Sequence, residues 1–350
     1  MLQANYIKYP LRFLHPAGTS RGVLTEKDSW FVILRDPETP GRTGIGECSL
    51  IPGLSRDRTD NFEDMLKAGC DRIRQGLPSG KFPDHPAIMF GFEMAMRDLD
   101  KGGKRMLFPS AFSAGKQGIP INGLIWMGSR HQMQAQVEGK MKQGFRVLKL
   151  KVGAIRFSDE LSILEAIRSV CGADELELRL DANGAWSAGE APEKLEQLSK
   201  FDIHSIEQPI AAGQPEQMAG ICATSPIPVA LDEELIDNYD PSSMQELLSR
   251  IRPAYIILKP SLLGGFAVSE IWIRTAAKTG TGWWVTSALE SNIGLNAIAQ
   301  WTATLDNPMP QGLGTGGLYE NNIPSPLVIR GDHLWHRADE SWNLSSLKFT

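Results

Sequence analysis

Short apolar segments alternate with helical patterns from Ile119 onward, over most of this 350-residue chain. We expect strands at 120–126, 145–151, 176–181, 203–207, 228–232, 254–259, 282–286 and 310–313. We expect helices between them at 129–142, 158–171, 187–199, 214–223, 241–248, 264–278 and 292–304. Strands that alternate with helices indicate βαβ units and a parallel sheet, and about eight strands in roughly 200 residues favour a closed barrel. The sequence therefore predicts an α/β fold with a modified (β/α) barrel of the TIM type.

The first part of the chain has a different pattern. Strands are expected at 7–14 and 30–34 with a loop over 15–28 between them, and helices at 58–75 and 86–99. Gly102, Gly103 and Pro109 then interrupt any regular element. We therefore predict an α+β capping domain over residues 1–115 and a catalytic barrel over 116–319, with segment 320–350 packing back on the capping domain.

Composition excludes several classes of function. The chain has 36 Lys and Arg against 41 Asp and Glu, a net charge of −5, which argues against binding to nucleic acid or to an anionic membrane. The four cysteines are scattered, as in a reducing compartment, and neither a signal peptide nor a long apolar run is visible. We expect a cytoplasmic protein that acts on a small molecule.

Charged residues end several of the expected strands. Lys149 and Lys151 alternate with apolar residues, so that both lysines face into the barrel. Asp181, Glu207 and Asp232 end three successive strands, 26 and 25 positions apart, which is the length of one βα unit. Active sites of such barrels lie at the carboxyl ends of the strands, so these side chains are expected to meet there.

Three converging carboxylates need a cation between them, because like charges cannot all stay ionised at close range. Oxygen ligands suit Mg²⁺, with Mn²⁺ as a substitute. A single acid here would be better explained as a helix N-cap, but three at unit spacing favour a metal site. Lys259 ends the sixth strand, on the other side of these acids from Lys151. Repulsion and a bound ion are expected to lower the lysine pKa values and to make one lysine a base.

The full set of motifs resembles the enolase superfamily. The matching motifs are Lys149-x-Lys151, Asp181-x-Asn183, Glu207-Gln208-Pro209, Asp232-Glu233 and Lys259-Pro260. The resemblance implies Mg²⁺ on Asp181, Glu207 and Asp232, and removal of a proton beside a carboxylate to give a metal-stabilised enediolate. It also implies Lys151 as the base, Lys149 as its electrostatic neighbour, and Lys259 on the opposite face of the substrate. Asn183 and Glu233 would support the metal ligands.

Lysines on both sides of the site are similar to the muconate-lactonising subgroup. Within it, the stretch from Ser287 to Gly294 and the glycine-rich segment 312–317 are most similar to o-succinylbenzoate synthases. That likeness implies dehydration of a succinyl-hydroxycyclohexadiene carboxylate, a step of menaquinone synthesis. The candidate substrate-binding residues are Ser287, Ser291, Gly314, Thr315 and Arg21. Ser291 is expected to begin a helix. Either the N-terminus of this helix binds a substrate carboxylate, or Ser291 serves only as an N-cap, and both alternatives are equally open.

Other functions fit parts of the same pattern. An N-acylamino acid racemase also needs two opposed lysines, so it remains the alternative, alone or together with the synthase activity. Dipeptide epimerase and cycloisomerase rank behind it, since the Asp-x-Asp pair typical of dipeptide epimerases is absent after the seventh strand. A non-catalytic barrel is disfavoured by the complete set of acids and lysines. His204 should point away from the barrel interior by strand alternation, and the oligomeric state is left open.

Overall fold

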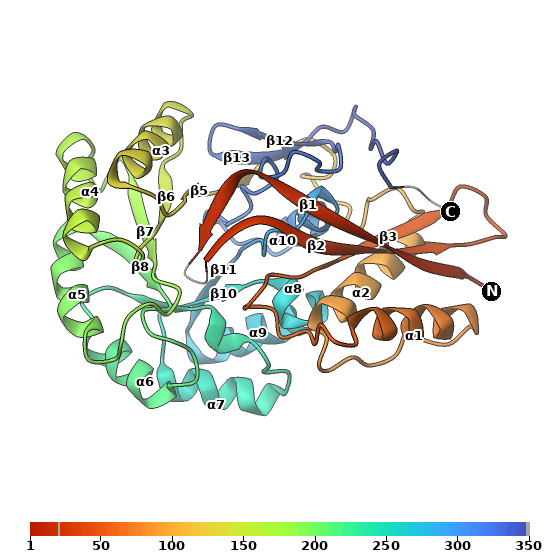
Figure 1. The fold of residues 1–350 in the computed structure, drawn as a ribbon, viewed down its shortest axis with the longest axis horizontal. Helices are drawn as coiled ribbons and strands as arrows, with labels where there is room; N and C mark the ends of the chain where they lie inside the picture. Colours follow the sequence, from red (N-terminus) through yellow and green to blue (C-terminus); the bar gives the residue numbers. More distant parts are fainter. Residues whose placement is uncertain (20–21, 348–350) are drawn as a thin grey trace.

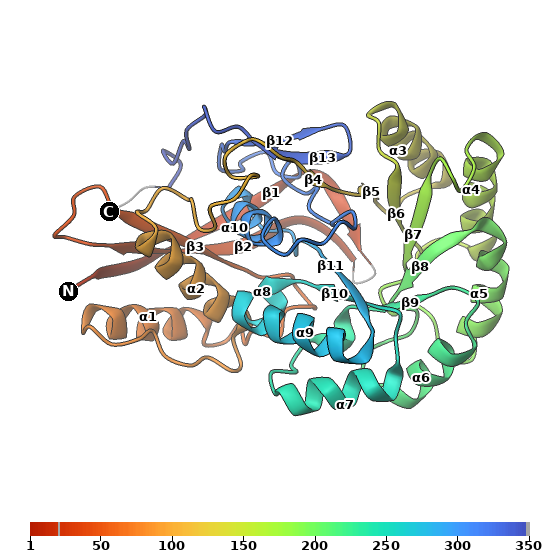
Figure 2. The same cartoon turned by 180° about the vertical axis from the view of Figure 1, so that it is seen from behind.

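The computed structural model describes residues 1–19 and 22–347, which form an N-terminal antiparallel sheet with two helices and a curled parallel sheet with its own helices (Figure 1). Arg21, a candidate substrate-binding residue, lies outside the described residues. Seen from behind, the two parts lie side by side, with the C-terminal segment along the top of the molecule (Figure 2).

The N-terminal sheet has the order β1 (Gln3–Thr19), β2 (Gly22–Arg35) and β3 (Thr43–Ser49), with helices α1 (Phe62–Arg74) and α2 (Pro86–Asp100). The loop expected over 15–28 is wrong, because β1 and β2 stay paired as far as Thr19 and Gly22. The register shifts between Arg12 and Ala17, and such an irregularity accommodates Pro16, which has no N–H for the ladder. Helix α2 packs closely on β3, since a Cβ on Gly46 would lie 1.9 Å from the Gly91 carbonyl oxygen.

The parallel sheet confirms the predicted alternation of strands and helices. Its order is β11-β10-β9-β8-β7-β6-β5, so each strand pairs with the next one along the chain. The strands are β5 (Gly123–Ile125), β6 (Val147–Lys151), β7 (Glu177–Asp181), β8 (Ile203–Glu207), β9 (Val229–Leu231), β10 (Tyr255–Leu258) and β11 (Gly282–Val285). The helices are α3 (Arg130–Lys142), α4 (Phe157–Val170), α5 (Ala191–Leu198), α6 (Pro215–Thr224), α7 (Pro241–Ile251), α8 (Pro260–Leu263), α9 (Phe266–Thr279) and α10 (Asn292–Thr302).

A very short eighth segment closes the barrel. Gln311 bridges to Ile121 beside β5, and Gly312 bridges to Thr286 beside β11, both in parallel orientation. Backbone hydrogen bonds complete this seam, such as that from the Asn122 N–H to the Gln311 carbonyl, at 3.0 Å. The eighth strand expected at 310–313 is therefore present, reduced to two bridging residues.

The C-terminal segment contacts both parts of the molecule. Tyr319 bridges to Phe13 of β1, and the Leu14 N–H donates to the Leu318 carbonyl. Further on, β12 (Leu327–Arg330) and β13 (His333–His336) form a three-stranded sheet with β4 (Ile119–Pro120), at the entry to the barrel. The division of the chain at residues 115 and 319 stays our prediction.

Apolar side chains fill both sides of the barrel wall. Leu148 and Leu150 belong to the large core between strands and helices, while Ala230, Ile257 and Trp284 form a separate buried cluster. The expected orientation of His204 is wrong, because its ring stacks on Tyr255 and lies 6.3 Å from Trp284. The register of β7 and β8 shifts beside it, and such an irregularity re-aims a side chain.

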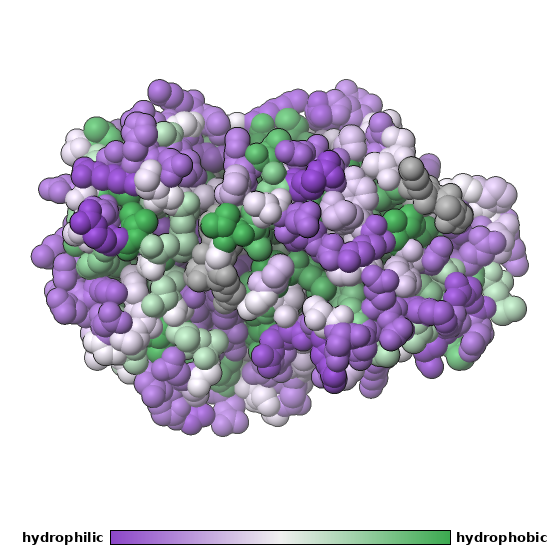
Figure 3. Space-filling model, viewed as in Figure 1, coloured by the Kyte–Doolittle hydropathy of each residue, from purple (hydrophilic) through white to green (hydrophobic). Residues whose placement is uncertain are grey.

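The outer surface is mixed in character. On the face shown in Figure 3, hydrophobic residues lie in separate small groups among hydrophilic ones. None of the helices in the described part of the chain has the length and apolar character needed to span a bilayer.

Candidate active site

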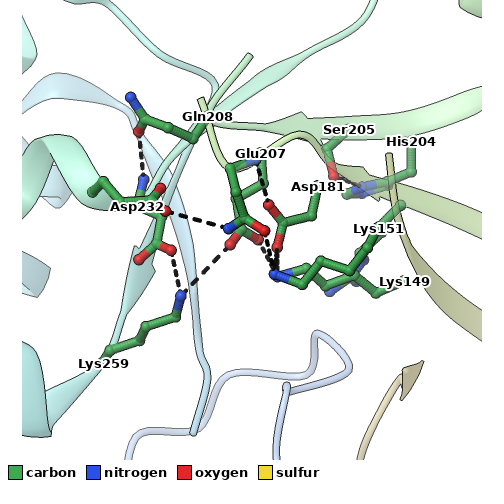
Figure 4. A network of polar contacts seen from close by, with 12 residues as sticks. Lys149, Lys151, Asp181, His204, Ser205, Glu207, Gln208, Asp232 and Lys259 are labelled. Atoms are coloured by element: carbon green, nitrogen blue, oxygen red, sulfur yellow. Dashed lines mark hydrogen bonds and ion pairs between the residues drawn. The ribbon is translucent and has the colours of Figure 1, made fainter. Parts of the chain in front are cut away.

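The predicted charged residues converge at the carboxyl ends of five neighbouring strands (Figure 4). Register places them there, since Lys151 lies opposite Asp181 and Asp181 opposite Glu207 in the parallel ladder. Asp232 directly follows β9, and Lys259 directly follows β10. Lysines therefore flank the carboxylates on two sides, from β6 on one side and from the end of β10 on the other.

Each carboxylate is paired with at least one lysine. The Asp181 Oδ2 lies 2.8 Å from the Lys149 Nζ and 2.7 Å from the Lys151 Nζ. Lys149 also donates to Glu207, whose Oε1 lies 3.8 Å from the Lys259 Nζ. Lys259 pairs in addition with Asp232. All these groups except Lys151 are buried, and the Lys151 side chain keeps 14% of its surface exposed.

The pKa values show how the charges balance. Burial raises the pKa of Asp181, but the lysines outweigh burial and the net pKa lies well below its usual range. Burial and the Asp181 charge raise the pKa of Glu207 to about 8. Burial lowers the pKa of Lys149 and of Lys259, but the adjoining carboxylates outweigh it and both pKa values are raised. Carboxylate attraction thus exceeds lysine repulsion in these pairs, and the lowered lysine pKa values expected beside a bound ion stay a prediction.

The residues fit a hard divalent cation. Among the described residues, no three Asp, Glu, His or Cys side chains already form a metal-binding group, and each of the predicted ligands is turned toward a lysine. The Glu207 Oε1 is nevertheless buried without a hydrogen-bond partner, and burial together with the Asp181 charge raises the Glu207 pKa although two lysines lie beside it. Three clustered carboxylates supply the oxygen ligands that Mg²⁺ prefers.

Residues next to the acids hold them in place. Asn183 has a φ of 45°, a left-handed conformation that turns the chain directly after β7. Its Oδ1 accepts from the Lys151 Nζ at 2.6 Å and its Nδ2 donates to the Glu233 Oε1 at 3.2 Å. Gln208, with a φ of 41°, links neighbouring strand ends because its Oε1 accepts from the Asp232 N–H at 3.1 Å. Asn183 and Glu233 are thus brought to the site, and Gln208, which the sequence motif contains without an assigned role, is a further supporting residue.

A pocket opens directly above the lysines. Its lining includes Lys149, Lys151 and Lys259, and three of the candidate substrate-binding residues, Ser287, Gly314 and Thr315. Apolar side chains from the N-terminal half of the chain, among them Ile51 and Trp126, also face it. A carboxylate-bearing ligand with an apolar body suits these walls, since its charge would meet the lysines.

Two polar residues of the pocket were missed by the sequence reasoning. Asn122 and Thr286 line it, and their buried Oδ1 and Oγ1 atoms have no hydrogen-bond partner. Both flank the short closing strand at Gly312, and the glycine-rich motif that marks this strand carries no signal for its neighbours. A strand of only two residues is too short to show an alternating pattern, so the sequence could not predict which neighbouring side chains face the pocket.

Ser291 lies outside the residues that line this pocket. Its N–H donates to the Glu47 Oε1 at 2.9 Å, and its hydroxyl donates to the Glu47 Oε2. The Gly294 N–H also donates to the Glu47 Oε2, at 2.9 Å. A carboxylate does occupy the N-terminus of α10, as helix geometry favours, but it belongs to β3 of this chain.

Comparison with known proteins agrees with this geometry. A family model described as "Enolase C-terminal domain-like" matches residues 132–337, which include all the lysines and acids of the site. The chain belongs to the enolase superfamily. This confirms the resemblance drawn from the motifs, and the parallel barrel with its N-terminal sheet confirms the predicted fold class.

Individual members of the enolase superfamily match over most of the chain. An o-succinylbenzoate synthase from Desulfotalea psychrophila is 46% identical, covering 94% of this chain and 98% of the relative. The crystal structure of MenC from Desulfotalea psychrophila superimposes with a TM-score of 0.85 and 42% identity, over 95% of this chain and 99% of that one. A D-Ala-D/L-Ala epimerase from Cytophaga hutchinsonii is 29% identical, covering 85% of this chain and 82% of the relative.

Proposed function

We propose that this enolase superfamily enzyme is an o-succinylbenzoate synthase. It would dehydrate 2-succinyl-6-hydroxy-2,4-cyclohexadiene-1-carboxylate to 2-succinylbenzoate, a step of menaquinone synthesis, as a lyase. The observation that carries the proposal is Lys151 facing the same pocket as Lys259, across a group of buried carboxylates. The 46% identity to a synthase supports the choice among the reactions of the superfamily.

Asp181, Glu207 and Asp232 would hold Mg²⁺, or Mn²⁺ in its place. When bound, the ion supplies stabilisation for negative charge that develops on the substrate carboxylate. The unsatisfied Glu207 Oε1 and the raised pKa of Glu207 support this assignment, because both are relieved by a positive charge. Asn183 and Glu233 would orient the ligands from behind, in line with the hydrogen bond between them.

Lys151 is the proposed base. It is the most exposed of the three lysines, and its amine form would take the proton from the carbon next to the ring carboxylate. The ammonium that results would then give a proton to the hydroxyl on the neighbouring carbon, which leaves as water. The electron pair released from the C–H bond forms the new double bond, and the ring becomes aromatic. Because one lysine serves both steps, the elimination is syn.

Lys149 and Lys259 would keep their charge during the reaction. The carboxylates around them raise both pKa values, so each stays an ammonium at neutral pH. Lys149 would act as the electrostatic neighbour of Lys151, since both lie on the Asp181 carboxylate. Lys259 would stabilise negative charge on the substrate from the opposite side. Ser287, Gly314 and Thr315 would contact the rest of the substrate. Arg21 remains a candidate from the sequence. Ser291 is left out because its hydroxyl binds Glu47.

The test is an assay of the purified chain with Mg²⁺ and the cyclohexadiene carboxylate, in which 2-succinylbenzoate is measured by NMR. We expect complete conversion, and loss of turnover when EDTA removes the metal. Protein that shows no turnover with either Mg²⁺ or Mn²⁺ would contradict the proposal.

A second candidate is racemisation of N-acylamino acids, favoured by the same opposed lysines. Lys151 would act on one face of the α-carbon and Lys259 on the other, in line with their positions on two sides of the carboxylates. N-Succinyl amino acids of both configurations, incubated in D₂O, distinguish the reactions. Exchange of the α-proton in both enantiomers shows the racemase activity, whereas dehydration alone shows a synthase without it.

A further inference from the structure

A buried carboxylate that the proposed mechanism does not use lies directly behind one wall of the pocket. Glu290 follows β11 and is fully buried, and it is not among the residues that line the pocket. Its Oε2 accepts from the Ser287 hydroxyl at 2.6 Å and from the Ala288 N–H at 2.8 Å. The Ser261 hydroxyl, two residues after Lys259, donates to its Oε1. Glu290 therefore joins the strand ends of β10 and β11.

The Ser287 hydroxyl continues this contact into the pocket. Ser287 donates to Glu290 and accepts from the Thr315 hydroxyl at 2.8 Å, and both Ser287 and Thr315 line the pocket. A hydroxyl has a single proton to donate. Both protons thus point along the chain Thr315–Ser287–Glu290, away from the ligand. The Ser287 oxygen also accepts from the Leu289 N–H at 3.1 Å, so both of its lone pairs are used, and the lone pairs of the Thr315 oxygen are the ones left for a ligand.

We propose that Glu290 is a positioning residue, which fixes the hydroxyls of Ser287 and Thr315 so that this wall of the pocket accepts hydrogen bonds and does not donate them. A wall of this kind repels a substrate carboxylate and accepts a hydrogen bond from a substrate hydroxyl. It therefore selects the pose in which the carboxylates of the substrate face the lysines. The inference rests on the proposed function for the identity of the substrate.

The surroundings of Glu290 support an acceptor role. Its carboxylate has three donors, the hydroxyls of Ser261 and Ser287 and the Ala288 N–H. Burial raises the pKa of Glu290, and these hydroxyls oppose that shift. The same turn holds Leu289 at a φ of 60°, a left-handed conformation that a branched residue adopts only when its surroundings enforce it.

The test is a double-mutant cycle on Glu290→Gln and Thr315→Val, read in KM and kcat of the dehydration. In Glu290→Gln the amide oxygen must keep the Ala288 N–H, and as a neutral acceptor it holds the Ser287 hydroxyl more weakly than the carboxylate does, so the hydroxyls of Ser287 and Thr315 are no longer fixed in one direction. We therefore expect KM to rise about tenfold and kcat to change by less than about threefold, the size expected for one or two hydrogen bonds. In the Thr315→Val background, Glu290→Gln should change KM by less than about twofold, because the chain no longer reaches the ligand.

Two control variants separate positioning from general damage. Glu93→Gln alters another carboxylate that accepts backbone N–H groups, those of Phe266 and Ala267. Thr302→Val alters a similarly buried threonine at the C-terminal end of α10. Both should leave KM unchanged. If Glu290→Gln does not fold, Ser261→Ala takes its place in the cycle, with a smaller rise in KM that again disappears with Thr315→Val.

An unchanged KM in Glu290→Gln, a loss confined to kcat, or fully additive effects in the cycle would overturn the positioning role. A wild-type chain without dehydration activity contradicts the proposed function alone. The same cycle is then measured as binding of 2-succinylbenzoate by calorimetry, where coupling between the two sites supports the role and additivity or no binding overturns it.

Discussion

At the scale of single residues, the Lys149 ammonium lies between the carboxylates of Asp181 and Glu207. A buried ammonium without the carboxylates, or buried carboxylates without the ammonium, would strongly destabilise the fold. Strand alternation and spacing predicted that these groups meet, because both depend only on the period of a strand and the length of a βα unit. They did not predict that each acid turns toward a lysine. That outcome depends on side-chain torsions and on local charge balance, which no sequence pattern carries.

Metal binding gives the first prediction. Mg²⁺ that binds the folded state alone should raise its stability, by about 3 kcal/mol at a hundred times Kd, so the melting temperature of the wild type should rise by several degrees. Asp232→Asn removes one proposed ligand and should abolish most of that rise. Glu138→Gln, an exposed acid on α3, should keep it. A rise that survives in Asp232→Asn would place the ion elsewhere. Melting is followed by calorimetry with and without Mg²⁺.

At the scale of elements, Glu47 ties β3 of the N-terminal sheet to the first turn of α10. Its carboxylate accepts from the Ser29 hydroxyl at 2.8 Å as well as from Ser291 and Gly294. Lys27, buried on β2, hydrogen-bonds Ser49 on β3 beside it. From sequence, Ser291 was predicted as an N-cap or a ligand group. The structure confirms the N-cap, since the Ser291 hydroxyl accepts from the Ile293 N–H at 3.1 Å. Its further partner, Glu47, comes from a strand more than two hundred positions away, and such a distant contact leaves no local signal.

Loss of this contact should weaken the whole fold. Glu47→Ala leaves the N–H groups of Ser291 and Gly294 buried without a partner, at a cost of about 1–3 kcal/mol for each unsatisfied group. We expect a decrease of about 3–5 kcal/mol in the free energy of unfolding, measured in urea. Glu138→Ala on the exposed face of α3 should change it by less than about 0.5 kcal/mol. Equal stability of the two variants would show that the contact is dispensable.

Asp57 gives a pH-dependent prediction for the start of α2. Its Oδ1 accepts from the Ala87 N–H at 3.0 Å, and burial raises its pKa to about 7, partly opposed by that hydrogen bond. Since the folded chain binds this proton more tightly than the unfolded chain, stability from this group is present below about pH 4 and is lost as pH rises to about 7. Wild type should therefore lose stability relative to Asp57→Asn between about pH 4 and about pH 7, by a few kcal/mol in urea unfolding. Asp84→Asn, an exposed control, should show no such difference, and parallel pH profiles for wild type and Asp57→Asn would contradict the assignment.

At the scale of the whole molecule, the alternation of strands and helices was enough to predict the barrel, since it repeats over many units. The long β1–β2 hairpin was not predicted, because Pro16 and Gly18 resemble loop residues and the pairing continues past them. The closing bridges at Gln311 and Gly312 were predicted only as a strand, without the neighbours that they bring into the pocket. What remained hidden in each case was a contact between distant segments.

The most direct test of the central claim, that Lys151 performs proton transfer in a dehydration, compares turnover of the cyclohexadiene carboxylate by wild type and Lys151→Ala with Mg²⁺ present. General acid–base groups typically contribute about 10²–10⁴-fold. The account predicts 2-succinylbenzoate formation by wild type, a fall in kcat of at least about a thousandfold in Lys151→Ala, and no change in Lys67→Ala, an exposed lysine on α1. Lys151→Ala that folds and retains the wild-type kcat would contradict it.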